Sequence, residues 1–234
     1  VPEIMAVMNS TRAGGEFANG LKHYPLYYYL FLPKQLINGD QWTFMFWSAL
    51  GLVSIAFIAI VYLYTRARQF PLLSISLAMA LVMLLIPAVG AFFNGMMAAS
   101  NRWTLLIYLP IAMSVCLLLQ NATQLDRHTL WILTCATGIY LLVLVVTYIF
   151  QNDTTMFMPI IFLIMSLLMI WIMNLHGTPH PDRWLVVIIL ANAACNALYV
   201  GTPCNGNFAN STLVRGQYQS IAKNRYGGLE QGLN

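Results

Sequence analysis

Six long apolar runs, separated by short polar stretches, dominate the pattern of residues along the chain. An α-helix needs about 20 apolar residues to cross the hydrocarbon core of a bilayer, with about 17 as the lower limit. The six runs are Phe44–Tyr64, Phe70–Val89, Trp103–Gln120, Leu130–Phe150, Met156–Leu175 and Trp184–Val200. Polar and apolar residues do not alternate with period two within them, which argues against an outer-membrane barrel. The pattern predicts an all-α, polytopic integral membrane protein with about six transmembrane helices.

Composition supports the same class of protein. Hydrophobic residues make up 59% of the chain and charged residues only 8%, too few to cover the surface of a soluble domain. The net charge of +4 is spread over loops and flanks. This distribution favours contact with anionic membrane lipids and predicts no nucleic-acid partner.

The runs divide the chain into three parts. Residues 1–41 are predicted to form an extracytoplasmic flank with an interfacial aromatic segment, and residues 42–201 a six-helix transmembrane domain. Residues 202–234 are predicted to start an extracytoplasmic C-terminal region. The chain opens on Val1 with no signal-peptide pattern, and its last segment is polar and rich in Asn and Gly. We expect it to be a piece of a longer protein.

Basic residues in the short loops indicate the orientation of the helices. With both flanks outside, the inner loops hold four arginines: Arg66, Arg68, Arg127 and Arg183. The short outer loops then hold only Arg102. Lys34 and Arg215, close to the first and last runs, count for the opposite orientation. The balance favours flanks outside the cytoplasm.

A dense aromatic cluster precedes the first run. The stretch Leu21–Leu36 reads LKHYPLYYYLFLPKQL, with tyrosines at positions 24, 27, 28 and 29. Tyrosine favours the headgroup zone of a membrane. We expect a helix or turn at the outer membrane surface that ends near Asn38–Asp40. Two functions are open for this segment. In the simpler interpretation it anchors the chain at the membrane interface, and in the second it binds a lipid-carried substrate.

The loop between the second and third runs carries the residues with the clearest chemical potential. The stretch Gly90–Trp103 reads GAFFNGMMAASNRW; Asn94 favours a turn, and Arg102 places a guanidinium at the start of a membrane helix. A guanidinium there can bind phosphate, and Trp103 can stack on a sugar ring. The predicted substrate-binding residues are Asn94, Asn101, Arg102 and Trp103. A plain interfacial Arg–Trp pair is the alternative.

Two stretches also resemble a known family. The run LIPAVGAFFNGMMAASNRWTLL (Leu85–Leu106) resembles the YfhO-like bacterial membrane proteins, in which a Pro-containing helix end leads to Asn-Gly and then to Asn-Arg-Trp opening the next helix. The preceding YYYLFLPKQLINGDQW (Tyr27–Trp42) is similar to the same family. The resemblance covers residues 24–220 in outline.

The resemblance implies a glycosyltransferase C-type (GT-C) architecture in the bacterial cytoplasmic membrane. Such a protein moves a sugar from a polyprenyl-phosphate donor to an extracellular glycopolymer such as teichoic acid, with a donor synthase and a flippase as partners. Its catalytic carboxylate usually lies in the first external loop, which we expect upstream of this chain, so no catalytic residue is assigned here. Arg102 would contact the donor phosphate, Asn94, Asn101 and Trp103 would shape the pocket, and the tyrosines would guide lipid or acceptor.

Two other classes of function stay open. A transporter or flippase needs a polar path, for which the candidates are Asn94, Gln120, Asn192 and Asn196, although the last two, four residues apart, also suit contacts between helices. No carboxylate lies within a run, which argues against proton-coupled transport. A non-catalytic scaffold is the third class. No nucleotide or metal motif occurs, and the four cysteines lack ligand spacing, so neither a cofactor nor a metal is expected.

Overall fold

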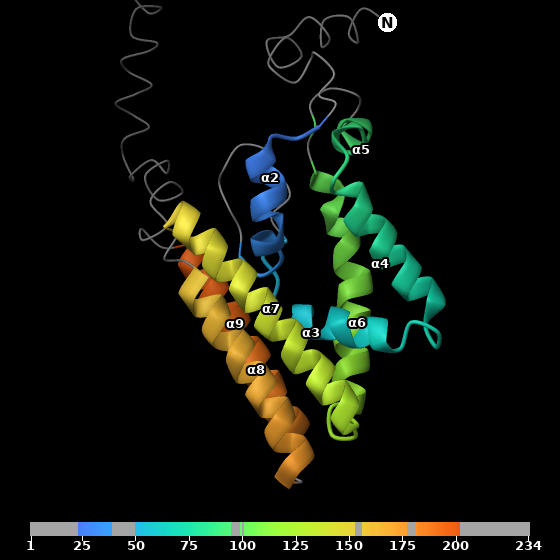
Figure 1. Cartoon of the computed structure of the whole chain (residues 1–234), viewed down its shortest axis with the longest axis vertical. Helices are drawn as coiled ribbons and strands as arrows, with labels where there is room; N and C mark the ends of the chain where they lie inside the picture. The colour runs from blue at the N-terminus through green and yellow to red at the C-terminus, as the bar shows by residue number, and fades with distance from the viewer. Residues whose placement is uncertain are drawn as a thin grey trace, which may run out of the picture. The chain divides into compact units, whose positions relative to one another are not determined.

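The computed structural model describes residues 23–38, 50–94, 99, 101–152, 156–176 and 181–201. This part of the chain consists of helices and turns, without a strand (Figure 1). The helices are α2 (Leu26–Phe31), η1 (Leu32–Leu36), α3 (Ile55–Thr65), α4 (Pro71–Met83), α5 (Pro87–Phe93), η2 (Arg102–Ile107), α6 (Tyr108–Asn121), α7 (Arg127–Gln151), α8 (Phe157–His176) and α9 (Pro181–Gly201). They confirm the all-α class.

The chain divides into two compact units, Val1–Ala193 and Ala194–Asn234. The first holds every helix up to α8 and the greater part of α9. Of the second unit, the described part is the end of α9. Most of the two predicted flanks, residues 1–22 and 202–234, lies outside the described residues.

Three helical segments are long and apolar enough to cross a membrane. They are Trp103–Asn121, Arg127–Gln151 and Phe157–Leu175, which match the third, fourth and fifth runs. The first of these opens with the 3-10 turn η2 and continues as α6, with Pro110 in its first α-helical turn. Proline is tolerated there because the first backbone N–H groups of a helix have no partner within the helix.

The first run does not form the predicted helix over its whole length. Residues 44–49 lie outside the described residues, and the helix α3 begins only at Ile55. Gly51 has a φ of 51°, in the left-handed region that interrupts a helix. The backbone N–H groups of Leu50 and Gly51 instead donate to the carbonyl of Gln35, and that of Leu52 donates to Leu36 at 2.8 Å. The prediction of a helix over residues 50–54 was therefore wrong.

The second run is broken rather than continuous. It forms α4 and α5, which meet at a bend of 99° across residues 84–86. Pro87 opens α5, and Ile86 before it is extended with φ −112° and ψ 108°. Proline disfavours helical backbone at the preceding residue and has no N–H to continue a helix. The single straight helix predicted over Phe70–Val89 was therefore wrong.

The number of membrane crossings is smaller on the described residues than the six predicted. Three segments qualify by length and composition, or four if the bent pair α4–α5 is one span. The apolar stretches Ile55–Thr65 and Arg183–Asn196 form shorter helices. Six crossings are thus not confirmed, whereas a helical membrane protein is.

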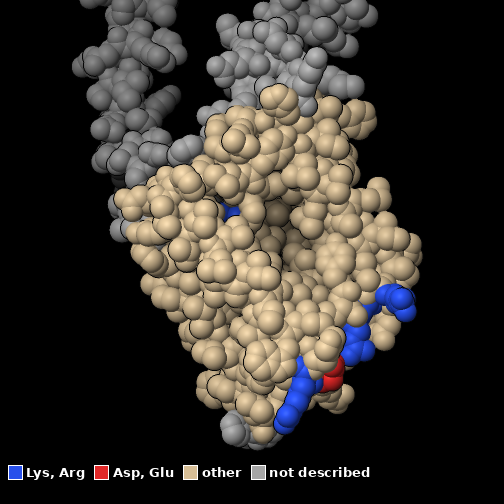
Figure 2. Space-filling model, viewed as in Figure 1, with Lys and Arg blue, Asp and Glu red and all other residues tan. Residues whose placement is uncertain are grey.

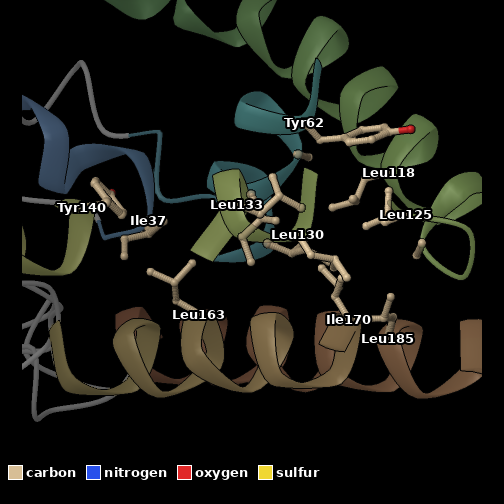
Figure 3. Packing of buried hydrophobic residues seen from close by; sticks show 14 of the residues in the cluster. Ile37, Tyr62, Leu118, Leu125, Leu130, Leu133, Tyr140, Leu163, Ile170 and Leu185 are labelled. Atoms are coloured by element: carbon tan, nitrogen blue, oxygen red, sulfur yellow. The ribbon is translucent and has the colours of Figure 1, made fainter. Parts of the chain in front are cut away.

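The core forms around α3, which crosses the longer helices and packs against α6, α7 and α8 (Figure 1). Ile58, Ala59 and Leu63 of α3 are fully buried. Figure 3 shows leucines of α6, α7, α8 and α9 meeting in one cluster, for example Leu133 and Leu163. The outward faces of the long helices are also apolar, as expected for helices that face lipid.

Candidate functional site

The tyrosine segment folds as the helices α2 and η1, which confirms its predicted helical form. Tyr24 and Tyr28, however, point inward and are 1% and 0% exposed. Their rings stack with centroids 4.1 Å apart, and Phe31 and Ala99 complete the cluster. These two tyrosines are therefore part of a buried cluster, and an anchoring role of the segment at the membrane surface stays a prediction.

A single amide joins this cluster to the start of the third run. The Nδ2 of Asn101 donates to the hydroxyls of Tyr28 at 3.0 Å and Tyr24 at 3.2 Å. Its Oδ1 accepts from the indole Nε1 of Trp103 at 3.1 Å and from Tyr24 at 3.4 Å. Asn101 is 1% exposed, so this side chain uses its hydrogen-bonding capacity inside the protein. Burial raises the pKa of the Tyr24 hydroxyl, against the opposing effect of Asn101, and the hydroxyl stays protonated as a donor.

Two tyrosine hydroxyls also hold the break between α4 and α5. Tyr28 donates to the carbonyl of Leu84 at 2.9 Å, and Tyr29 donates to that of Leu85 at 3.2 Å. Carbonyls released by a helix break need another donor when water is excluded. The tyrosine segment thus fixes both sides of the loop that follows α5: the bend before it and Asn101 after it.

Beside this framework lies an apolar groove of about 430 Å³ between α4 and α6. Its walls include Leu73, Met79 and Met83 of α4 and Met113 of α6. Phe93 and Trp103 also line it, and their rings stack with centroids 5.6 Å apart. The lining is almost entirely apolar, so the groove suits a hydrocarbon chain better than a polar solute.

The four predicted substrate-binding residues lie around one end of this region. Trp103 lines the groove, and Asn101 positions Trp103 through its hydrogen bond. Asn94 ends α5 as its C-cap. Arg102 begins η2, and its side chain lies outside the described residues. Their contact with a substrate stays a prediction.

Lys34, which the sequence analysis counted among the charges that indicate orientation, is a buried cation. Lys34 in η1 is only 1% exposed, and its Nζ donates to Oε1 of Gln151 at the end of α7 at 2.7 Å. Next to it, the hydroxyl of Tyr140 donates to the carbonyl of Pro33 at 2.8 Å. The only sequence signal was a lysine embedded between Leu32 and Leu36. Because Lys34 is enclosed, it has little weight in a count of surface charges for orientation.

Several hydroxyl groups within the long helices form hydrogen bonds with the backbone of their own helix. The hydroxyls of Ser114, Thr147 and Ser166 donate to carbonyls four residues earlier at 2.7 to 2.9 Å. Asn192 of α9 is buried, and its Oδ1 accepts from the backbone N–H of Ser54 at 2.9 Å. It thus joins α9 to the start of α3, in line with the prediction of a contact between helices.

Comparison with known proteins gives one finding. The sequence model of the family described as bacterial membrane protein YfhO matches residues 1–226. Searches of curated proteins and of solved structures give no significant match. The matched part includes the tyrosine segment, the broken helix and the Asn-Arg-Trp start of η2. On this match and its apolar helices, the chain belongs to the YfhO family of bacterial membrane proteins.

Proposed function

We propose that this protein is the membrane portion of a GT-C type glycosyltransferase that takes a sugar from a polyprenyl-phosphate donor. The acceptor is an extracellular glycopolymer such as teichoic acid. No residue of this chain is assigned as the catalytic carboxylate that would activate the acceptor. Residues of this chain contribute the donor site.

The groove between α4 and α6 is the observation that carries the proposal. A polyprenyl chain is a long hydrocarbon, and burying its surface contributes roughly 25 cal/mol per Å². The groove is apolar along α4 and α6 and ends at Phe93 and Trp103. A donor lying in it would place its phosphate next to the start of η2.

Arg102 is the residue that would meet this phosphate. It directly precedes Trp103, which lines the groove. A guanidinium forms bidentate, charge-assisted hydrogen bonds with phosphate oxygens and stabilises the negative charge of the leaving lipid phosphate. The stacked pair of Phe93 and Trp103 then offers an aromatic surface beside the sugar.

The topology is part of the same proposal. We place the protein in the cytoplasmic membrane with both flanks outside and all six apolar segments crossing or entering the bilayer. Donor synthase and flippase act before it, because the lipid-linked sugar must be made and brought to the outer leaflet.

A transporter or flippase is the second candidate, and the polar residues argue against it. Its four proposed residues are divided among three elements: Asn94 at the end of α5, Gln120 in the last turn of α6, and Asn192 and Asn196 on α9. The Oδ1 of Asn192 accepts from the backbone N–H of Ser54, and the hydroxyls of Ser114 and Ser166 donate to their own helices. The Nδ2 of Asn192 has no hydrogen-bond partner among the described residues. A scaffold without catalysis predicts that replacing Asn101, Arg102 and Trp103 together leaves function intact.

The test compares surface glycopolymers by mass spectrometry in cells with the full-length gene, without it, and with Arg102→Ala. We expect one sugar modification to be lost in both defective strains, while the Arg102→Ala protein remains in the membrane at normal level. Arg183→Ala, an exposed arginine on α9, is the matched control and should retain the modification. Glycopolymers identical in all strains would contradict the transferase and favour a transporter or scaffold.

A further inference from the structure

A second cavity, of about 670 Å³, lies at the turn between α3 and α4 and the start of α7. Its walls come from the end of α3, from the turn 66–69 and from Asp126 and Thr129. The groove described above has no residue in common with it. About half of its surface is polar, in contrast to the apolar groove. The cavity is therefore suited to a polar or charged group.

The charge of the cavity favours an anion. Arg66 and Arg68 both line it, against the single carboxylate of Asp126. Asp126 is engaged by α7: its oxygens accept from Thr129, from the backbone N–H at 3.1 Å and from the hydroxyl at 2.6 Å. These bonds lower the pKa of Asp126 and keep it ionised, so the cavity carries a formal charge of about +1 from its lining. Figure 2 shows basic and acidic side chains together along the lower right edge of this face.

The donors available to a ligand are side chains. The backbone N–H groups of Gln69 and Phe70 both donate to the carbonyl of Arg66, at 2.8 and 3.2 Å. They are therefore used within the turn and do not serve as donors to a ligand. The guanidinium groups of Arg66 and Arg68 line the cavity as multidentate donors, although that of Arg66 also interacts with the hydroxyl of Tyr62. Two such forks around one cavity match the several acceptor oxygens of a phosphodiester.

The surroundings point to a lipid as the source of this phosphate. Leu72, in the first turn of α4 just after the arginine turn, is 84% exposed, and Phe70 and Tyr64 are about 40% exposed. These apolar side chains continue into the lipid-facing flank of α4. A ligand that fits both parts has a charged headgroup for the cavity and acyl chains for the flank.

We propose that this cavity binds the headgroup of an anionic phospholipid of the phosphatidylglycerol class. Arg66 and Arg68 hold the phosphate oxygens, and the carboxylate of Asp126 accepts from a hydroxyl of the glycerol. The acyl chains lie against Phe70 and Leu72. The site is separate from the proposed donor site and does not rest on glycosyl transfer.

The test measures lipid binding by native mass spectrometry on the purified full-length protein, with phosphatidylglycerol as the probe. Arg66→Gln together with Arg68→Gln should weaken binding about tenfold or more, since charged hydrogen bonds are lost. Arg183→Gln removes one exposed arginine outside the cavity and should leave binding unchanged. The double variant Arg66→Lys and Arg68→Lys keeps the charge and should recover part of the affinity.

Two further probes identify the ligand. Phosphatidylethanolamine, which has no net charge, and soluble glycerol 3-phosphate should each bind at least about tenfold more weakly than phosphatidylglycerol. Equal binding of the zwitterionic lipid would overturn selection for an anionic headgroup. Equal binding of glycerol 3-phosphate would overturn a lipid ligand in favour of a soluble one. Unchanged binding in the folded Arg66→Gln, Arg68→Gln protein would remove the cavity from lipid recognition.

Discussion

Asn101 places one amide among three aromatic side chains, Tyr24, Tyr28 and Trp103, at a position shielded from water. The neighbouring Arg102 and Trp103 are the residues that we assign to the donor. Asn101 itself is occupied by these partners. Its contribution to the site is therefore to position Trp103 and the start of η2, because an amide with satisfied hydrogen bonds has little capacity left for a ligand.

Replacing Asn101 by leucine should destabilise the protein strongly. The substitution leaves buried hydroxyl and indole groups without their partner, and each such group costs about 1–3 kcal/mol. The matched control is Asn121→Leu, because Asn121 is partly exposed and its side chain donates to the carbonyl of Leu117 in its own helix. Thermal unfolding of the purified full-length protein compares the two. Equal melting temperatures in both variants would show that the network contributes no stability.

Asp126 gives a prediction for the dependence on pH. Its pKa is lowered from the usual 3.8 by hydrogen bonds from Thr129. A carboxyl whose pKa falls on folding stabilises the folded state above its unfolded pKa, and this contribution is lost as the pH falls through the folded pKa. Hydrogen exchange of the first turn of α7, corrected for intrinsic rates, should thus show constant protection from about pH 7 to about pH 5. Asp126→Ala should lower that protection, whereas Gln124→Ala should not. Equal protection in Asp126→Ala would show that the cap is unimportant.

The broken helix α4–α5 is the element that shapes the candidate site. Pro87 sets the break, and Tyr28 and Tyr29 supply donors to the two carbonyls that it releases. The 99° bend moves Phe93 to the end of the groove beside Trp103. A straight helix over the same residues could not place Phe93 there.

Tyr28→Phe should therefore loosen α5 more than Tyr29→Phe. Each hydroxyl also accepts a second hydrogen bond, that of Tyr28 from Asn101 and that of Tyr29 from the backbone N–H of Tyr24. Tyr28 is fully buried, so water cannot replace its bonds, whereas the bond of Tyr29 to Leu85 is at the surface. We expect faster hydrogen exchange over residues 84–93 in Tyr28→Phe, and a change several times smaller in Tyr29→Phe. The opposite ranking would mean that the buried hydroxyl does not hold the bend.

The sequence predicts α7 and α8 well and α3 and α4–α5 poorly, for a physical reason. A continuous apolar run indicates residence in the membrane, but it carries no period that reports where a helix starts or bends. Gly51 and Pro87 were visible signals for the two breaks. Their effect depends on distant partners, namely the carbonyls of η1 and the tyrosines of α2, which pattern along the chain does not reveal.

At the scale of the molecule, the polar cavity differs chemically from the apolar groove, whose far end lies at Phe93 and Trp103. The turn 66–69 and Asp126 line one cavity, so they lie on the same side of the membrane. The basic residues there favour the cytoplasmic side. In the proposed topology the start of η2 lies on the outer side, one crossing away along Trp103–Asn121.

This arrangement is testable by cysteine labelling in a full-length protein whose own cysteines are replaced. Gln69→Cys and Gln124→Cys should both react with a membrane-impermeant maleimide only when the reagent reaches the cytoplasmic face. Both positions are exposed and belong to turns next to the cavity. Labelling of either position from outside in intact cells would contradict the orientation.

The candidate site was predictable in part. Asn101, Arg102 and Trp103 were recognised from their position at the start of a membrane helix and from the family resemblance. The hydrogen bonds of Asn101 with Tyr24 and Tyr28, 77 and 73 residues away, were not predicted. The pattern of a single sequence contains no information on such long-range contacts. Lys34 was missed because a lysine beside a run is ordinarily a surface residue.

The central claim is that the groove between α4 and α6 holds the lipid donor of a sugar transfer. The most direct measurement is transfer of labelled sugar from synthetic polyprenyl-phosphate sugar to acceptor glycopolymer by full-length protein in proteoliposomes. Met79→Trp fills the groove with a larger side chain. Ile75→Trp is the matched control on the same helix, because Ile75 does not line the groove and is exposed to the same degree, 57% against 59% for Met79. We predict a rate at least about tenfold lower at limiting donor for Met79→Trp and an unchanged rate for Ile75→Trp. Equal, undiminished transfer in both variants would contradict a donor in this groove, and absence of transfer in the unmodified protein would contradict the transferase itself.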